Sequence, residues 1–382
     1  MPQESWTADD HRFMARAIQL AEQGLYTTPP NPRVGCVLVK HGSIIAEGWH
    51  QKAGQAHAEV LALRAAGEAA QGATAYVTLE PCSHHGRTGP CAEALVKANV
   101  AQVVAAMQDP NPLVAGQGFA LLQKAGIATR YGLMQGQAEA LNPGFISRMA
   151  RQRPWVRLKL AASADGRTAM ASGESKWITG SAARSDVQRL RARSCALITG
   201  AGTVLHDNPA MTVRQDQLGL EQAAEIVARQ PLRVVLDDAA ALSGNEQIFS
   251  EPGRVIYVAR EGSPVRPGLA SKQHVAVWAT PAEQTRQVQL QALLARLAAE
   301  EQCNEVLVEA GAGVAGAFVE AGLVDELWLY MAPVLMGNEA RPLVRLPITT
   351  MAERQHLVLD DAVSIGADLR LRYRIANNEV EH

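Results

Sequence analysis

The chain has 382 residues, more than a single hydrophobic core usually supports, so we expect two domains. Hydrophobic residues make up 47% of the chain and charged residues 19%, values that exclude a disordered protein. The net charge is −2 and aromatic residues make up 4%, which argues against non-specific binding of nucleic acid or of membrane surfaces.

Targeting signals and cysteine usage both point to the cytoplasm. The first residues do not form a basic start followed by an apolar core, and no apolar run approaches the roughly 18 residues of a membrane span. The cysteines are sparse and odd in number, which disfavours a disulfide framework in a chain of this length: Cys36, Cys82, Cys91, Cys195 and Cys303. We therefore expect a soluble protein in a reducing compartment.

In the first part of the chain, predicted strands alternate with predicted helices, the order typical of an α/β domain. Thr7 and Asp10 form a Thr-x-x-Asp pattern that predicts a helix start. We predict helices at 7–23, 57–70, 91–98 and 118–125, and strands at 34–40, 43–47, 74–79, 100–107 and 127–131. The polar, basic segment SRMARQRP at 147–154 breaks this pattern, so we expect domains at residues 1–150 and 151–382.

The second part of the chain predicts another α/β domain, with an antiparallel edge at its C-terminal end. We predict helices at 181–193 and 281–300, and strands at 155–160, 196–199, 232–236, 255–258, 275–279, 305–309, 325–331 and 368–375. A glycine-rich loop at 311–316 separates the strand at 305–309 from a short helix.

Four residues of the first domain predict a catalytic zinc site. His57 and Glu59 open a predicted helix, Cys82 follows a strand, and Cys91 opens the next helix, where the helix N-terminus favours its thiolate. One imidazole and two thiolates leave a fourth position for water, and Glu59 would move the proton without binding metal. The alternatives are cysteines that only fill the core, or a structural zinc site, which normally has four protein ligands.

The segments around these residues resemble the N-terminal half of the RibD family of bifunctional riboflavin-biosynthesis deaminase/reductases. They are NPRVG at 31–35, HAE at 57–59 and PCSHHGRTGPC at 81–91. Eight residues separate the two cysteines, where the general deaminase signature has two, and Gly89 stands where the family has proline. By this resemblance His57, Cys82 and Cys91 bind Zn²⁺ and Glu59 shuttles the proton.

Polar residues near these motifs have two interpretations each. Asn31, beside two prolines, either contacts the amide edge of a pyrimidine substrate or only shapes a turn. His84, His85 and Arg87 either contact a substrate phosphate or form an exposed polar loop. The other histidines are interpreted as surface or core residues: His11, His50 and His206.

The second domain contains GAGVAG at 311–316, which matches G-x-G-x-x-G in a strand–loop–helix setting. Backbone amides and the helix dipole at such a loop can hold a dinucleotide pyrophosphate. A Rossmann domain would place the loop after its first strand, with an acidic residue about 20 positions later, and this chain does neither. We therefore expect phosphate binding in a different α/β fold, and NADP in preference to NAD.

Four segments of this domain resemble the reductase half of the same family, which has a dihydrofolate-reductase-like fold: 158–169, 173–179, 202–209 and 309–311. The resemblance implies NADPH contacts from Ala161, Trp177, Thr203, Asp207, Gly311, Ala312, Gly313, Val314, Ala315, Gly316 and Ala317. It implies substrate contacts from Ser175, Arg191, Met211, Arg214 and Glu309. Lys159, with Glu309 beside it, is the candidate catalytic residue that activates the ribose carbonyl or its Schiff base.

Three of these basic residues also have structural interpretations. Lys159 alternates with Arg157 along a strand, as in a solvent-facing row. Arg191 and Arg214 suit a phosphomonoester through forked hydrogen bonds, but Arg191 lies on an arginine-rich helix whose exposed face must be solvated.

The resemblance as a whole implies two consecutive reactions. The first domain would deaminate 2,5-diamino-6-(5-phosphoribosylamino)pyrimidin-4-one to 5-amino-6-(5-phosphoribosylamino)uracil, and the second would reduce the ribosyl side chain to ribityl with NADPH. The alternatives are another zinc nucleobase deaminase fused to an unrelated reductase, and an RNA-binding module with an inactive centre. The presence of Glu59 and the net charge of −2 disfavour the latter. We expect a small-molecule substrate and a homo-oligomer, either a dimer or a tetramer.

Overall fold

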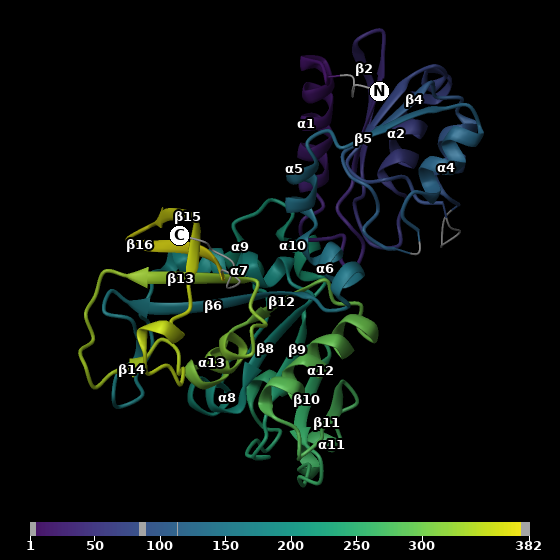
Figure 1. Cartoon of the computed structure of the whole chain (residues 1–382). Coiled ribbons are helices and arrows are strands. Elements are labelled where there is room, and N and C mark those ends of the chain that lie inside the picture. Colours follow the sequence, from purple (N-terminus) through teal and green to yellow (C-terminus); the bar gives the residue numbers. More distant parts are fainter. Residues whose placement is uncertain (1–4, 84–88, 113, 376–382) are drawn as a thin grey trace. The chain divides into compact units, whose positions relative to one another are not determined.

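The chain folds into two compact units, Met1–Arg153 and Pro154–His382, in the computed structural model (Figure 1). The structure describes residues 5–83, 89–112 and 114–375. The boundary between the two units, after Arg153, lies within the segment 147–154, but most of that segment is helical, because helix α6 spans Pro143–Arg151. Arg151 is exposed and donates to Ser147 Oγ at 2.8 Å, and the buried Ser147 donates in turn to the Arg153 carbonyl. The polar residues of this segment therefore form the end of a helix and bind one another there.

The first unit is a five-stranded mixed sheet with helices on both faces. The strands, in the order β2-β1-β3-β4-β5, are β1 Gly35–Lys40, β2 Ser43–Trp49, β3 Thr74–Val77, β4 Gln102–Ala105 and β5 Ala128–Tyr131. The helices are α1 Ala8–Glu22, α2 Ala58–Ala66, η1 Gly67–Ala70, α3 Cys91–Lys97, α4 Gln117–Lys124, α5 Gln135–Leu141 and α6. The predicted N-cap of α1 is confirmed, since Thr7 Oγ1 accepts from the Asp10 amide at 3.1 Å.

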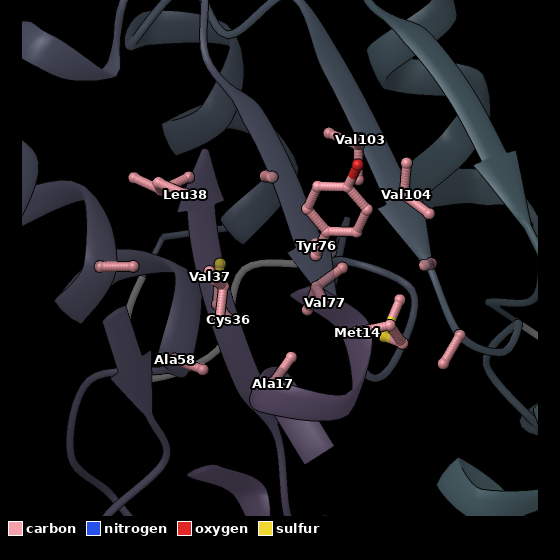
Figure 2. Packing of buried hydrophobic residues seen from close by; sticks show 14 of the residues in the cluster. Met14, Ala17, Cys36, Val37, Leu38, Ala58, Tyr76, Val77, Val103 and Val104 are labelled. Atoms are coloured by element: carbon pink, nitrogen blue, oxygen red, sulfur yellow. The ribbon is translucent and has the colours of Figure 1, made fainter. Parts of the chain in front are cut away.

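The core of this unit lies on both sides of β1, whose residues are buried almost throughout (Figure 2). Met14 and Ala17 of α1 and Ala58 of α2 belong to the same hydrophobic cluster as Cys36 and Leu38 of β1. Helices α1 and α5 pack together, and α2, α3 and α4 form the other helical layer. The expected three-layer α/β/α arrangement is confirmed.

The second unit is a nine-stranded sheet in the order β11-β10-β9-β8-β12-β6-β13-β16-β15. The strands are β6 Trp155–Ser163, β8 Ala196–Gly200, β9 Leu232–Leu236, β10 Val255–Arg260, β11 Val275–Thr280, β12 Glu305–Val308, β13 Glu326–Ala332, β15 Leu357–Ile365 and β16 Asp368–Ile375. A separate pair joins β7 Arg167–Ala169 to β14 Arg341–Pro342. The helices are α7 Ser181–Arg193, α8 Ala201–Asp207, α9 Gln215–Leu218, α10 Ala223–Val227, η2 Gln247–Phe249, α11 Pro267–Ala270, α12 Arg286–Ala299, α13 Ala312–Glu320 and η3 Met351–Glu353.

The strands from β11 to β13 run parallel, whereas β16 and β15 run antiparallel at one edge, as predicted for the C-terminal end. Apolar residues of α12 and α13 pack on one face of the sheet and those of α7 on the other. Mixed α/β architecture is thereby confirmed in both halves. Within the described ranges, none of the helices combines the length and apolarity that crossing a membrane requires.

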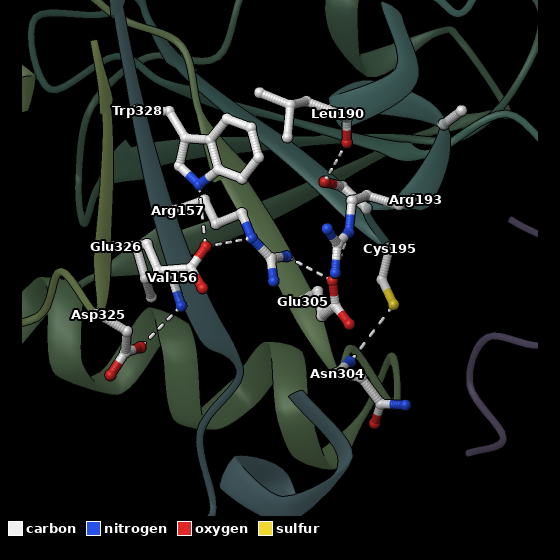
Figure 3. Close-up of polar contacts among 12 residues, drawn as sticks. Val156, Arg157, Leu190, Arg193, Cys195, Asn304, Glu305, Asp325, Glu326 and Trp328 are labelled. Carbon is white, nitrogen blue, oxygen red and sulfur yellow. Dashed lines mark hydrogen bonds and ion pairs between the residues drawn. The ribbon is translucent and has the colours of Figure 1, made fainter. Parts of the chain in front are cut away.

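A buried ion cluster holds the start of the central strands together (Figure 3). Arg157 of β6 is 1% exposed and pairs with Glu305 of β12 and, at 2.7 Å, with Glu326 of β13. Arg193, at the end of α7, donates to Glu305 at 3.2 Å. Because Arg157 is buried and paired, the interpretation of Arg157 and Lys159 as a solvent-facing row is wrong.

Candidate active sites

Three predicted zinc ligands converge at the start of two helices in the first unit. His57 Nδ1 lies 3.2 Å from Cys91 Sγ and 3.6 Å from Cys82 Sγ. All three ligand atoms lie within 4.8 Å of one another, close enough for a single metal ion to bind them. Cys91 is the first residue of α3, and His57 is the N-cap of α2. One nitrogen and two sulfur donors suit tetrahedral zinc with a fourth position for water.

Hydrogen bonds distribute the charge unevenly between the two thiols. The Cys91 amide donates to Cys82 Sγ at 3.3 Å. The hydrogen bond from the Cys91 thiol, with further help from His57, lowers the pKa of Cys82, although burial opposes this shift. The shared proton and burial raise the pKa of Cys91. The amide at the start of α3 therefore stabilises the Cys82 thiolate.

Glu59 lies beside these ligands, on the first turn of α2. Its side chain is 3% exposed, and its Oε2 atom has no hydrogen-bond partner among the described residues. Burial, followed by the negative charge of Cys82, raises the pKa of Glu59 to about 7. A Cβ atom on Gly48 of β2 would lie 2.4 Å from the Ala58 carbonyl oxygen, so this glycine allows α2 to start close to the sheet. A buried carboxyl group with an unused oxygen is suited to general acid–base catalysis.

His50 is a site residue that the sequence analysis missed. It is 2% exposed, and its ring centroid lies 5.4 Å from that of His57. Its Nδ1 donates to the Ala56 carbonyl at 3.1 Å, which leaves Nε2 to accept from Asn31 Nδ2 at 3.0 Å. Asn31 is thus tied to the zinc-ligand region by a buried imidazole. His84, His85 and Arg87 lie outside the described residues.

In the second unit, a buried ion pair lies at the carboxyl ends of the central strands. Arg191 of α7 binds Glu309, which follows β12, through two hydrogen bonds of 2.6 and 3.0 Å. Arg191 also donates to the Thr212 carbonyl at 3.2 Å and lies 3.9 Å from the Met211 sulfur. The sequence analysis expected the Arg191 guanidinium to bind a substrate phosphate, but in the structure it binds the Glu309 carboxylate.

Lys159 of β6 is half-buried and shares this environment. Burial lowers its pKa, the positive charge of Arg191 acts in the same direction, and the negative charge of Glu309 opposes both. Burial raises the pKa of Glu309, but the charge of Arg191 and its hydrogen bonds outweigh this and leave the pKa lowered. Ala161 lies two residues after Lys159 on β6, so its side chain is on the same face of the sheet as that of Lys159. A lysine of lowered pKa beside a carboxylate can donate a proton or activate a carbonyl group.

Two further hydrogen bonds link predicted NADPH and substrate residues. The Gly311 amide donates to Thr203 Oγ1 of α8 at 3.1 Å, and Ser175 Oγ donates to Asp207 Oδ1 at 3.3 Å. Helix α13 begins at Ala312, so the glycine-rich motif forms its first turns and not a free loop, which corrects the prediction. Gly313 is exposed, and a Cβ atom there would meet no atom within 4 Å. An open helix N-terminus of this kind fits a dinucleotide phosphate.

The remaining predicted residues differ in accessibility. Trp177 is 68% exposed, with the Arg184 guanidinium 4.6 Å above its ring. Arg214 is exposed at the start of α9, and its amide donates to Gln188. Ala315 is fully buried in the core, and a Cβ atom on Gly316 would lie 1.9 Å from the Arg345 carbonyl oxygen. The last glycine of the motif thus permits close packing of α13. Val314 and Ala317 are partly buried on the same helix.

Two family models match the two units. One, described as the cytidine and deoxycytidylate deaminase zinc-binding region, matches residues 7–107, and the other, the RibD C-terminal domain, matches residues 154–370. The second unit therefore matches the reductase domain of the family that the motifs of the first unit resemble, and the alternative of an unrelated reductase is wrong.

Similarity to known proteins extends over nearly the whole chain. The riboflavin biosynthesis protein RibD of Escherichia coli (strain K12) is 49% identical over 366 residues, which cover 95% of this chain and 98% of that protein. RibD of Haemophilus influenzae is 48% identical and covers 96% of this chain, or 98% of its own length.

Solved structures agree with this similarity. One form of Acinetobacter baumannii RibD has a TM-score of 0.89 and 49% identity, covering 97% of this chain and 99% of that structure. A Thermotoga maritima structure, titled a diaminohydroxyphosphoribosylaminopyrimidine deaminase/5-amino-6-(5-phosphoribosylamino)uracil reductase, has a TM-score of 0.81 and 32% identity, covering 96% and 99%. With the expected zinc-ligand cluster in one unit and the reductase architecture in the other, the chain belongs to the RibD family of bifunctional riboflavin-biosynthesis deaminase/reductases.

Proposed function

We propose that this chain catalyses two consecutive steps of riboflavin biosynthesis. Its first unit deaminates 2,5-diamino-6-(5-phosphoribosylamino)pyrimidin-4-one, and its second unit reduces the ribosyl side chain of the product with NADPH. The observation that carries this proposal is the convergence of His57, Cys82 and Cys91 beside the buried carboxyl group of Glu59. The family membership of the whole chain supports the coupling of this centre to a reductase.

In the deaminase unit, His57 Nδ1, Cys82 Sγ and Cys91 Sγ would hold zinc. The bound ion supplies Lewis acidity, which lowers the pKa of a coordinated water. Glu59 takes a proton from the attacking water and delivers it to the amino group, which leaves as ammonia. Asn31 presents its amide to the pyrimidine edge, and the hydrogen bond to His50 fixes the orientation of that amide.

In the reductase unit, Lys159 would protonate or activate the ribose carbonyl, and NADPH, when bound, would supply the hydride. Glu309 and Arg191 hold one another and set the charge around Lys159. The exposed start of α13 and Thr203 form the cofactor phosphate site, and Asp207 is a further NADPH contact. The other residues proposed to contact NADPH are Ala161, Trp177, Ala312, Val314 and Ala317, and those proposed to contact substrate are Ser175, Met211 and Arg214. The expected NADPH contacts of Ala315 and Gly316 are wrong, because Ala315 is fully buried in the core and Gly316 packs against the Arg345 carbonyl.

The proposed function is tested with purified full-length chain, zinc, NADPH and the diaminopyrimidinone ribosylamine phosphate. We expect ammonia release and NADPH oxidation in equal amounts. Ammonia release without NADPH oxidation would leave only the deaminase half of the proposal, and the absence of both would reject the substrate.

Loss of a zinc ligand gives a direct test of the metal site. Cys82→Ser replaces a soft thiolate with a hydroxyl group, so we expect zinc binding to weaken by more than the roughly 10- to 100-fold that loss of a supporting group costs. Zinc content after dialysis against a chelator measures this. Cys303→Ala, which removes a buried thiol of the other unit, should retain zinc. Equal zinc content in the two variants would remove Cys82 from the ligand set.

The role of Lys159 is tested by Lys159→Met, which keeps most of the side-chain volume and removes the amine. We expect NADPH oxidation with the deaminated substrate to slow by roughly 10²-fold, while ammonia release from the diamino substrate is unchanged. Lys272→Met is the matched control in the same unit. A wild-type rate of NADPH oxidation in Lys159→Met would assign the proton transfer to another group.

We also propose a homo-oligomer, a dimer or a tetramer. Strand β15 forms one edge of the nine-stranded sheet, and three of its apolar side chains, Leu357, Leu359 and Val363, are 43%, 53% and 37% exposed. Strand β15 pairs with β16 on one side only, so its outer edge and these apolar side chains support association with a second copy. Light scattering coupled to gel filtration would contradict the proposal if it gave the mass of one chain.

A cytoplasmic location is proposed on the cysteine chemistry. All five cysteines are free thiols, two of them in the proposed zinc site, which needs reduced sulfur. Cell fractionation with an antibody to the chain tests this proposal, and recovery in an oxidising compartment would contradict it.

A further inference from the structure

Glu80 lies two residues before Cys82 and is 4% exposed. Its carboxylate accepts hydrogen bonds from four backbone amides of one distant segment. Oε2 accepts from Asp109 at 3.1 Å and Gly116 at 3.0 Å, and Oε1 accepts from Gly118 at 2.9 Å and Phe119 at 3.4 Å. Gly118 and Phe119 belong to the first turn of α4, whose N-cap, Gly116, has no side chain. Glu80 therefore caps α4 from another part of the chain.

The backbone around Glu80 is fixed as well. Beyond the ends of the parallel strands β3 and β4, the Glu80 amide donates to the Met107 carbonyl at 3.0 Å. On the opposite side, α4 approaches Pro81 so closely that a Cβ atom on Gly118 would lie 2.1 Å from the Pro81 carbonyl oxygen. The segment that leads into Cys82 is thus held by its backbone, by the Glu80 side chain and by direct packing.

The next residues connect the Glu80 clamp, by which we mean Glu80 and its four amide donors between 109 and 119, to the zinc ligands. The Cys82 carbonyl accepts from the Ala92 amide at 3.1 Å, and Cys82 Sγ accepts from the Cys91 amide at 3.3 Å. Both amides belong to the start of α3, which packs against α4. Cys82 therefore has α3 on one side and the Glu80 clamp on the other, and its thiol position depends on both.

We propose that Glu80 is a positioning residue of the deaminase centre, which fixes Pro81 and Cys82 against α4 and so holds the Cys82 sulfur in place for zinc. This inference rests on the proposed zinc ligands. Glu80 acts through the backbone, since its carboxylate binds amides of the 109–119 segment. Zinc–sulfur bonds tolerate errors of only about 0.2 Å, so a small displacement of Cys82 weakens binding. Groups that support metal ligands typically contribute a factor of about 10 to 100 in metal affinity.

Glu80→Gln tests the proposal in the full-length protein. Glutamine has the same shape, but its NH₂ group would face two of the four N–H donors and could not accept from them. We expect zinc release to a chromogenic chelator to become about 10- to 100-fold faster. We also expect altered thiolate-to-metal and d–d absorption bands in the cobalt-substituted protein, while NADPH oxidation with the deaminated substrate is unchanged. Glu68→Gln, an exposed substitution in the same unit, should behave as wild type.

Gly118→Ala tests the position of Pro81 and Cys82 from helix α4, without a change to Glu80 itself. Its new Cβ atom must displace Pro81 or α4, so faster zinc release and altered cobalt bands are again expected. Gly136→Ala is the control, because a Cβ atom there meets no atom within 4 Å. If near-ultraviolet circular dichroism shows that Glu80→Gln does not fold, Gly118→Ala decides the question.

The outcomes separate this inference from the proposed function. Wild-type protein that takes up no zinc would reject the proposed ligands themselves. Wild-type protein that binds zinc, with unchanged release rates and cobalt spectra in Glu80→Gln and Gly118→Ala, would overturn the positioning role and leave the zinc site intact.

Discussion

Glu59→Gln is expected to slow ammonia release by about 10⁴-fold, the upper end of what a general acid–base residue contributes. Glutamine fills the same buried space but cannot carry a proton at its terminal oxygen. The structure supports a specific effect, because Glu59 is 3% exposed, has a buried oxygen without a partner among the described residues, and lies beside the zinc ligands. Zinc content should remain at the wild-type level, since Glu59 is not a proposed ligand.

The same variant tests the order of the two reactions. With the diamino substrate, NADPH oxidation should stop along with ammonia release, whereas the deaminated substrate should be reduced at the wild-type rate. NADPH oxidation that continues at full rate on the diamino substrate would show that reduction does not wait for deamination. Glu68→Gln is again the matched control, because it makes the same chemical change on the surface of the same unit.

Arg157→Met is expected to lower the free energy of unfolding of the reductase unit by about 3–5 kcal/mol. Arg157 is 1% exposed and neutralises Glu305, which is 2% exposed, and Glu326. Removal of the guanidinium leaves two carboxylates in the interior without their main partner, and Arg193 compensates only in part through its 3.2 Å bond to Glu305. The desolvation of those carboxylates then remains uncompensated.

Urea unfolding followed by intrinsic fluorescence measures this effect. The control is Arg254→Met, which removes an arginine that is 61% exposed from its pair with Glu301. Exposed pairs contribute at most about 1 kcal/mol, so this variant should unfold near the wild-type urea concentration. Equal midpoints for the two variants would mean that the buried cluster contributes no more than a surface pair.

The sequence predicted most of the regular structure, and its errors have physical causes. Helices α5 and α6, which meet at Asn142-Pro143, were not predicted, because an asparagine followed by a proline usually indicates a turn. Proline also suits the first position of a helix, and it has that position in α6. Strand β15 was missed because most of its residues are exposed, so it has no alternation of buried and exposed positions. The parallel core strands were predicted because their apolar runs are continuous.

The candidate sites were predictable where a few neighbouring residues carry the chemistry. His57, Glu59, Cys82 and Cys91 stand in short motifs whose residue types and order along the chain indicate a zinc site. Glu80 could not be assigned in this way, because its partners are backbone amides 29 to 39 residues away, which no side-chain pattern reveals. The pairing of Arg191 with Glu309, across 118 residues, is equally invisible in the sequence.

The position of β6 in its sheet also affects how the chain is synthesised. This first strand of the second unit lies between two late strands, β12 and β13, and its Arg157 contacts Glu305, 148 residues further along the chain. At 5–20 residues per second, a ribosome takes about 7–30 s to make the intervening segment. During that time β6 has neither of its neighbours, and Lys159 lacks the Arg191–Glu309 ion pair that interacts with it in the folded unit. The first unit, whose strands all lie before residue 132, can complete its sheet much earlier, so the two activities mature at different moments during translation.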